Sequence, residues 1–232
     1  MSDASVAERR PTDRVNRRDV NTLRVTEIFY SLQGEARAAG APTVFVRLTG
    51  CPLRCDYCDT AYAFHGGQRW GMDDILAEVA THGVQHVCVT GGEPLAQPAC
   101  AALVRRLCDA GYRVAVETSG ALDIRPIDTR ASRIVDLKTP GSGECQRNRW
   151  DNLDVLTGDD QIKFVICDRA DFDWAAAVCR EYGLWDRCPV WFSPSHGQVE
   201  PSALADWILG ERLPVRLQLQ LHKQLWGDQP GR

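Results

Sequence analysis

Short apolar runs rich in β-branched and aromatic residues recur along the chain, and polar segments separate them. Runs of this length that end at turn residues are typical of buried strands, and we expect strands at 23–29, 43–48, 86–90, 113–117, 134–137, 162–166, 189–192 and 215–219. Apolar residues at helical spacing between them predict helices over 73–80, 99–110, 172–182 and 202–209. Strands that alternate with helices predict an α/β fold, with a parallel sheet that is open or partly closed into a barrel.

Polar motifs stand at the ends of six of these strands, at residues 51–60, 90–94, 117–120, 136–141, 193–197 and 220–223. In parallel β/α folds the carboxyl ends of the strands lie on one rim, and ligands bind there. We therefore expect the motifs to form one binding site, which is a stronger inference than any single motif allows.

The chain of 232 residues fits one domain, which we place at residues 21–232. Arginines alternate with acidic residues before it, and this pattern predicts a disordered tail over residues 1–20. The formal net charge of −4 argues against a nucleic-acid partner, because such proteins carry a strong basic patch. A basic arm for RNA, built from the arginines of the tail, is the less favoured alternative.

No apolar run is long enough to cross a bilayer, and the first residues lack the apolar stretch of a secretory signal. We therefore expect a cytoplasmic protein that does not contact a membrane. Seven of the ten cysteines are scattered, mostly in apolar runs, where cysteine behaves as a small buried hydrophobe. Three others lie close together, and in a reducing compartment such a group indicates metal binding or catalysis.

The close group is Cys51-x-x-x-Cys55-x-x-Cys58. Three thiolates are one fewer than a closed four-cysteine iron–sulfur site, and an iron without a protein ligand can bind a substrate or cofactor directly. A structural zinc site with His65 as fourth ligand is the alternative. Zinc would not explain the motifs at the other strand ends.

The three-cysteine spacing, with the aromatic Tyr57 before the last cysteine, resembles the signature of the radical S-adenosylmethionine superfamily. That resemblance implies a 4Fe–4S cluster on Cys51, Cys55 and Cys58 that reductively cleaves S-adenosylmethionine to a 5′-deoxyadenosyl radical. The segment Thr90-Gly-Gly-Glu-Pro94 is similar to the superfamily loop that receives the methionine amino group. Glycines let backbone approach a ligand closely, and a carboxylate can accept a hydrogen bond from an ammonium.

Further motifs narrow the resemblance: Leu32-Gln-Gly-Glu35, Cys58-Asp-Thr60, Asp136-Leu-Lys138 and Gln220-Leu-His-Lys223. Together they resemble the 7-carboxy-7-deazaguanine synthase family, from about residue 23 almost to the C-terminus. The resemblance implies an incomplete parallel (β/α) barrel of the radical S-adenosylmethionine type, a homodimer and a Mg²⁺ requirement. It also implies conversion of 6-carboxy-5,6,7,8-tetrahydropterin to 7-carboxy-7-deazaguanine with loss of ammonia, on the route to queuosine. S-adenosylmethionine would be regenerated, and a flavodoxin or ferredoxin would supply electrons.

The resemblance also implies roles for individual residues. The pterin would contact Leu32, Gln33, Gly34, Arg47, Thr90 and Asp228, with Glu117 and His222 as catalytic residues. S-adenosylmethionine would contact Gly92, Glu93, Ser119, Asp136, Leu137, Lys138, Ser193, Pro194, Ser195 and His196, and Thr60 would ligate Mg²⁺. Plainer alternatives remain open: a surface ion pair for Arg47, a turn hydroxyl for Thr60, and structural roles for Glu117 and His222.

One departure from the family pattern concerns loop shape. Ala36 stands where the family motif Leu-Gln-Gly-Glu-Gly has its last glycine. An alanine at that position is strained if the backbone needs a positive φ. Two other functions stay open from the sequence: an activating enzyme for a glycyl-radical protein, which shares the cysteine loop, and a non-catalytic metal-binding module.

Overall fold

The computed structural model describes residues 21–227, 229 and 231, so the tail predicted over residues 1–20 and the residue Asp228 lie outside the described part. The strands are β1 Thr22–Leu32, β2 Pro42–Leu48, β3 Gln68–Gly71, β4 His86–Gly91, β5 Arg113–Thr118, β6 Ser132–Asp136, β7 Gln161–Ile166, β8 Val190–Pro194 and β9 Arg216–Leu217. The α-helices are α1 Met72–Thr81, α2 Cys100–Asp109, α3 Arg169–Tyr182, α4 Pro201–Glu211 and α5 Leu221–Trp226. Among the helices so described, none is both long and apolar enough to span a membrane.

All strands belong to one nine-stranded sheet in the order β3-β1-β2-β4-β5-β6-β7-β8-β9. From β2 through β9 neighbouring strands run parallel, as the alternation of strands and helices predicts. The chain begins differently, because β1 is antiparallel to both β2 and β3. Residues 33–41 join β1 to β2, and this loop is shorter than the crossover of about a dozen or more residues that parallel strands need.

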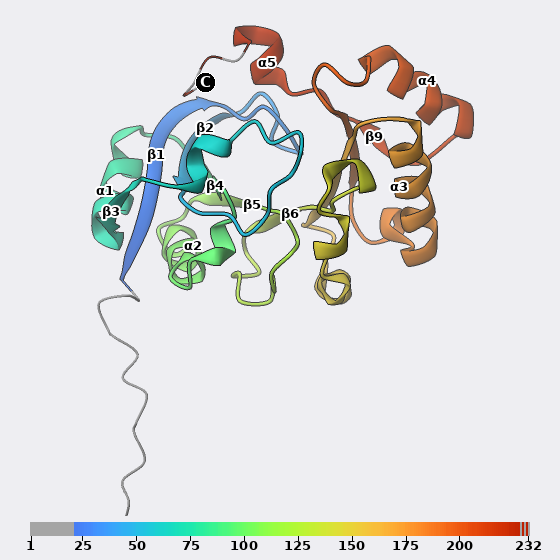
Figure 1. Ribbon diagram of the computed structural model, residues 1–232. Helices are drawn as coiled ribbons and strands as arrows, with labels where there is room; N and C mark the ends of the chain where they lie inside the picture. The colour runs from blue at the N-terminus through green and yellow to red at the C-terminus, as the bar shows by residue number, and fades with distance from the viewer. Residues whose placement is uncertain (1–20, 228, 230, 232) are drawn as a thin grey trace, which may run out of the picture.

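The sheet is curved and open, with β3 at one edge and β9 at the other. Helices α2, α3 and α4 lie on its outer side, against β5, β7 and β9 respectively (Figure 1). This is the incomplete barrel that the sequence predicts. The carboxyl ends of the parallel strands therefore meet on one rim.

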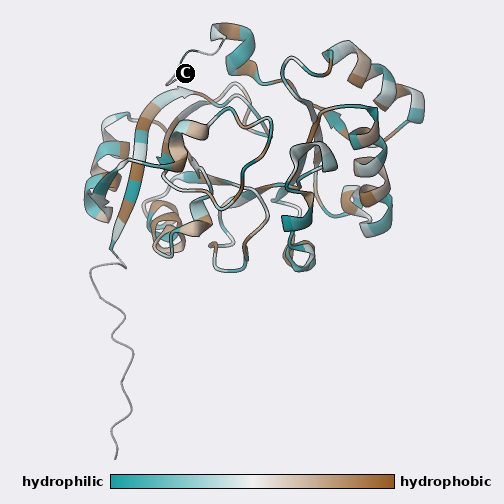
Figure 2. Cartoon of the chain, viewed as in Figure 1, coloured by the Kyte–Doolittle hydropathy of each residue, from teal (hydrophilic) through white to brown (hydrophobic). Residues whose placement is uncertain are grey.

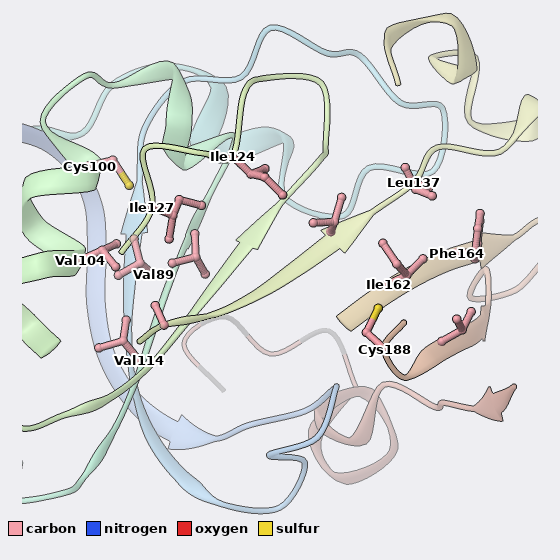
Figure 3. Close-up of a cluster of buried hydrophobic side chains, with 14 of the residues drawn as sticks. Val89, Cys100, Val104, Val114, Ile124, Ile127, Leu137, Ile162, Phe164 and Cys188 are labelled. Carbon is pink, nitrogen blue, oxygen red and sulfur yellow. The ribbon is translucent and has the colours of Figure 1, made fainter. Parts of the chain in front are cut away.

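The hydrophobic core fills the space between the sheet and its outer helices. Helix α2 alternates hydrophobic and hydrophilic residues along its ribbon (Figure 2), and its fully buried Val104 lies near Val89 and Val114 of the sheet (Figure 3). Phe164 of β7 packs edge-to-face on Phe192 of β8, with ring centroids 5.5 Å apart. Each buried side chain of this size contributes about 1.5–3 kcal/mol, so the core holds the rim in place.

The scattered cysteines behave largely as predicted. Four of them are buried, and three are half-buried: Cys88, Cys100, Cys179 and Cys188, then Cys108, Cys145 and Cys167. All ten cysteines lie in the described part of the chain and are free thiols, so no disulfide joins any two of them. The cysteines of the 51–58 loop differ from the buried ones, because all three are half-buried at the rim.

Candidate active site

A pocket of about 450 Å³ opens at the carboxyl ends of the strands. All six predicted strand-end motifs contribute to its lining. The predicted residues that line it are Cys51, Cys55, Cys58, Thr60, Gly92, Glu117, Ser119, Asp136, Lys138, Ser193, Pro194, Ser195 and His196. Segments far apart in the sequence thus form one site.

The cysteine loop follows β2 and is held by backbone hydrogen bonds. The N–H of Gly50 donates to the carbonyl oxygen of Ala63 at 2.8 Å, and the N–H of Cys58 donates to that of Cys55 at 3.1 Å. Burial raises the pKa of Cys55 to about 11, so this thiol stays protonated until a metal binds and displaces the proton. The three sulfur-bearing residues face one pocket, which fits a group held by Cys51, Cys55 and Cys58.

The alternative for this loop is a structural zinc site with His65. Within residues 21–227, no three His, Cys, Asp or Glu side chains converge on a single metal position. One zinc ion would need its ligand atoms about 2.0–2.3 Å from a common point. A cluster of several irons needs its thiolates farther apart, because each binds a different iron. His65 does not line the pocket that the three cysteines share, so a group held by the cysteines alone is favoured over the Cys₃His alternative.

The Gly-Gly-Glu segment after β4 packs tightly against the cysteine loop. A Cβ atom on Gly92 would lie 2.1 Å from the carbonyl oxygen of Gly50, and one on Gly91 would lie 2.6 Å from that of Leu48. The N–H of Glu93 donates to the carbonyl oxygen of Gly50 at 2.7 Å. The glycines are thus required for close packing between the two loops, in addition to any approach to a ligand.

Glu93 does not line the pocket and is fully buried. Its carboxylate accepts hydrogen bonds from the N–H of Leu95 at 2.9 Å, from the Thr118 hydroxyl at 2.9 Å and from the Ser119 N–H at 2.7 Å. These contacts join the loops after β4 and β5. The predicted contact of this carboxylate with a ligand ammonium remains a prediction. It is not favoured here, because both carboxylate oxygens already accept hydrogen bonds from the protein.

Two polar atoms at the pocket have no hydrogen-bond partner in the described part of the chain. They are the hydroxyl of Tyr57 and the Oδ1 atom of Asp136, both buried. The other carboxylate oxygen of Asp136 accepts from the Lys138 ammonium at 3.0 Å. An unsatisfied buried polar group costs about 1–3 kcal/mol, so these atoms mark where a polar ligand would bind.

Lys138 carries its charge in this pocket. Burial alone would lower its pKa, but the Asp136 carboxylate together with the nearby Cys55 and Cys51 raises the pKa above its ordinary value. Its ammonium also lies 5.6 Å from the centre of the Tyr57 ring. A charged lysine beside an unsatisfied carboxylate oxygen fits a ligand with both an anionic and a donating group.

A second cavity, of about 160 Å³, adjoins the first. It contains every described residue that was predicted to contact the substrate, together with the two predicted catalytic residues: Leu32, Gln33, Gly34, Arg47, Thr90, Glu117 and His222. Thr60 and Glu117 line both cavities. The predicted contact at Asp228 lies outside the described residues.

Glu117 is held in a fixed orientation between the cavities. Its Oε1 atom accepts from the Gln33 amide at 3.3 Å, and its Oε2 atom accepts from the Thr90 hydroxyl at 3.0 Å. Arg47 pairs with Glu27, whose Oε1 atom accepts from its Nε at 2.7 Å. Arg47 also lines the cavity, so its position is compatible with both roles considered for it: an ion pair and a contact with the substrate.

Several polar residues to which the sequence assigned no individual role line the site: Glu35, Asp59, Lys163 and Lys223. Lys163 pairs with Glu35, and the Lys223 ammonium lies 3.3 Å from the Oδ2 atom of Asp59. Lys163 had one visible signal, since it is the only charged residue in the apolar run of β7. Leu137, by contrast, was predicted to contact the cofactor, but its side chain is fully buried in the core and does not line the pocket.

Comparison with known proteins places this arrangement among related chains. The sequence model described as "Radical SAM superfamily" matches residues 45–191. The 7-carboxy-7-deazaguanine synthase of Chlorobaculum tepidum is 42% identical over 207 residues, which cover 88% of this chain and 94% of the relative. That of Koribacter versatilis is 44% identical and covers 88% of this chain and 97% of the relative.

A solved structure shares the fold. The crystal structure of QueE from Escherichia coli matches with a TM-score of 0.71, covering 87% of this chain and 95% of the other. Its sequence identity is 22%, so this likeness concerns the fold alone. The fold is thus one that another chain adopts with a largely different sequence.

Proposed function

This chain belongs to the Radical SAM superfamily and, within it, to the 7-carboxy-7-deazaguanine synthase family, and from that premise we propose that it converts 6-carboxy-5,6,7,8-tetrahydropterin to 7-carboxy-7-deazaguanine with loss of ammonia. One observation carries the proposal. The cysteine-lined pocket and the cavity with Arg47 share a wall that includes Thr60 and Glu117. A radical generated in the first pocket would therefore meet a substrate held in the second.

The chain's residues fit the cofactors of the family. Cys51, Cys55 and Cys58 would hold a 4Fe–4S cluster, and the unsatisfied atoms of Tyr57 and Asp136 would bind polar groups of S-adenosylmethionine. When bound, these groups supply a 5′-deoxyadenosyl radical that abstracts a hydrogen atom from the substrate. The contribution of the protein is to orient the ligands and to exclude water, because the radical chemistry belongs to the cofactor.

The second cavity offers complementary groups for a carboxylated heterocycle. The Arg47 guanidinium provides a planar donor fork for a carboxylate. Burial disfavours the charged form of Arg47, but the Glu27 carboxylate 2.7 Å away compensates the charge, and the pKa stays above its ordinary value. The Glu117 carboxylate, oriented by Gln33 and Thr90, can accept from an aminopyrimidine edge. These contacts would pin the ring with one C–H toward the first pocket.

A Mg²⁺ ion at Thr60 would add a second charge to the substrate carboxylate. The Thr60 hydroxyl donates to the Oδ1 atom of Asp59 at 2.8 Å, which leaves its lone pairs free to bind a cation. Mg²⁺ takes few protein oxygens and fills its octahedron with water and substrate oxygens. Thr60 lines both cavities, so an ion there would lie beside the ligands of each.

Three further features belong to the proposal. We infer a cytoplasmic homodimer that receives electrons from a flavodoxin or ferredoxin, as the family resemblance implies. S-adenosylmethionine would be regenerated in each turnover. The glycyl-radical activating function is not favoured, because Arg47, Gln33 and Glu117 form a small cavity suited to a small molecule rather than a polypeptide.

An anaerobic assay tests the proposal. Reconstituted and reduced protein is incubated with the carboxylated pterin, S-adenosylmethionine and Mg²⁺, and ammonia and deazapurine are measured. Both products should form at equal rates. Cleavage of S-adenosylmethionine without either product, together with transfer of a radical to a partner protein, would instead identify an activating enzyme.

A further inference from the structure

The C-terminal segment, residues 218–223, contacts the loop that follows β1. The N–H of Leu221 donates to the carbonyl oxygen of Gly34 at 3.0 Å, and the N–H of Ala36 donates to the Oε1 atom of Gln218 at 2.5 Å. The segment reaches the cysteine loop as well, through the ion pair of Lys223 with Asp59 at 3.3 Å. It therefore joins two loops that are distant in the sequence.

This segment forms one wall of the substrate cavity. His222 lines the cavity and packs so closely on Gly34 that a Cβ atom there would lie 2.3 Å from its Nδ1 atom. Gln220 lines the same cavity from the segment. Without the segment in this position, the cavity would lose both side chains and open to solvent.

The carboxylate of Glu35 is the point at which the segment is attached. Its Oε1 atom accepts from the Gln220 amide at 2.9 Å, and its Oε2 atom accepts from the Gln218 amide at 3.0 Å. The Lys163 ammonium of β7 pairs with the same Oε2 atom. The side chains of Lys163 and Glu35 are only 14% and 12% exposed, so each depends on the other for its charge compensation.

We propose that Glu35 and Lys163 are positioning residues: their ion pair anchors the C-terminal segment, and through it His222, against the substrate cavity. The proposal rests on the proposed function for its catalytic consequence, but not for the anchoring itself. Lys163 fixes the carboxylate from the sheet, and the carboxylate binds both glutamine amides of the segment. Burial alone would raise the pKa of Glu35, yet Lys163 and Gln220 hold it below its ordinary value, so the anchor is charged at neutral pH.

A second buried ion pair of the chain provides a matched control. Arg133 pairs with Asp160 at 2.5 Å, with side chains 3% and 1% exposed. Neither residue lines the cavities described above or bonds to residues 218–223. Removal of this pair disturbs the amino-terminal ends of β6 and β7 without removing any bond of the anchor, and so reports the effect of a purely structural ion pair.

Hydrogen–deuterium exchange of the reconstituted full chain tests the anchor directly. The double variant Glu35→Gln with Lys163→Met removes both charges, so that neither is left buried alone. We expect amide exchange in peptides covering residues 219–224 to rise about tenfold or more, while β4 is unchanged. The control, Arg133→Met with Asp160→Asn, should leave residues 219–224 at the wild-type rate. Unchanged exchange in the double variant, or an equal rise in the control, would overturn the proposal.

A second variant tests the anchor in case the double variant does not fold. Gln220→Met removes one hydrogen bond from the segment side and leaves the ion pair intact. It should also raise exchange of residues 221–224, and unaltered exchange in this variant would count against the anchor.

The kinetic consequence separates positioning from structure. In both test variants the KM for the carboxylated pterin should rise about tenfold, with a smaller fall in kcat, whereas the control keeps the wild-type KM. Glu35, Lys163 and Gln220 line the cysteine pocket as well as the substrate cavity, so a fall in S-adenosylmethionine affinity is compatible with the anchor. An unchanged KM for the pterin in both test variants would contradict it. If no protein makes deazapurine, the proposed function fails, and the exchange experiment still decides whether Glu35 and Lys163 anchor the segment.

Discussion

The carboxylate of Glu93 accepts hydrogen bonds from both the N–H and the hydroxyl of Ser119, at 2.7 and 2.6 Å. This relationship joins the Gly-Gly-Glu loop after β4 to the loop after β5. The cysteine loop is attached to the same unit, because the N–H of Glu93 donates to Gly50. A residue expected to bind a ligand is thus a structural link between three loops of the rim.

Replacement of Glu93 should therefore reduce stability. Glu93→Ala leaves several buried donors unsatisfied, and we expect the free energy of unfolding to fall by about 3 kcal/mol. Glu93→Gln keeps one acceptor and should cost about half as much. Urea denaturation of the apoprotein measures both values. A change below about 0.5 kcal/mol in Glu93→Ala would show that these hydrogen bonds are not stabilising.

The cluster assignment predicts a clean division among the cysteines. Cys55→Ala should abolish the absorbance of the iron–sulfur cluster after anaerobic reconstitution, because a thiolate at an open cluster has no ready replacement. Cys145→Ala and Cys188→Ala should retain it, since neither residue lines the pocket. Full iron content in the Cys55→Ala protein would refute the assignment.

The proposed Mg²⁺ site predicts a selective defect. Thr60→Ala removes one oxygen from the wall between the cavities but none of the cysteines, so cluster and S-adenosylmethionine binding should persist. Stimulation of turnover by Mg²⁺ should fall about tenfold, because octahedral Mg²⁺ loses a protein ligand. Thr60→Ser, which keeps the hydroxyl, is the matched control. If Thr60→Ala responds to Mg²⁺ like the wild type, Thr60 is only a turn residue.

Ala36 adopts a strained backbone conformation, as expected if this position of the motif needs a positive φ. Its φ is 62°, in the left-handed region, which costs an alanine roughly 1–2 kcal/mol. Ala36→Gly relieves this strain. Glycine also raises the entropy of the unfolded chain, which lowers the free energy of unfolding by about 0.4–1 kcal/mol. The net effect should be a gain in stability of up to about 1 kcal/mol.

Ala39→Gly is the control for Ala36→Gly in thermal unfolding. Ala39 lies in the same loop, and its φ is not among the positive values. This change should lower stability by about 0.5–1 kcal/mol. Equal losses in the two variants would show that Ala36 is not strained.

The sequence predicted the rim well, and for a physical reason. Buried parallel strands are short runs of β-branched residues such as Val87 and Val89, and polar residues begin where burial ends. The positions of Cys51, Thr90 and Asp136 at strand ends follow from that change in polarity. Strand β3 was missed because Trp70 is its one large apolar residue and the strand lies at the sheet edge.

Contacts between distant segments could not be predicted from local pattern. Glu35 and Lys163 are 128 positions apart, and no periodicity relates them. The antiparallel direction of β1 likewise depends on the length of the loop that joins it to β2. For Glu93 a local motif was visible but indicated a different role. The motif indicates a ligand contact, whereas the hydrogen bonds of Glu93 hold the loops together.

The measurement that tests the proposed reaction most directly is the ratio of deazapurine formed to S-adenosylmethionine consumed. It is made on the reduced, reconstituted protein with excess carboxylated pterin and Mg²⁺, and Arg47→Met serves as the comparison. A radical that is passed to the substrate and returned predicts many product molecules for each S-adenosylmethionine lost, with turnover in Arg47→Met about a hundredfold lower because the carboxylate has lost its planar partner. A ratio of one or less, or a wild-type rate in Arg47→Met, would contradict the proposed reaction in this cavity.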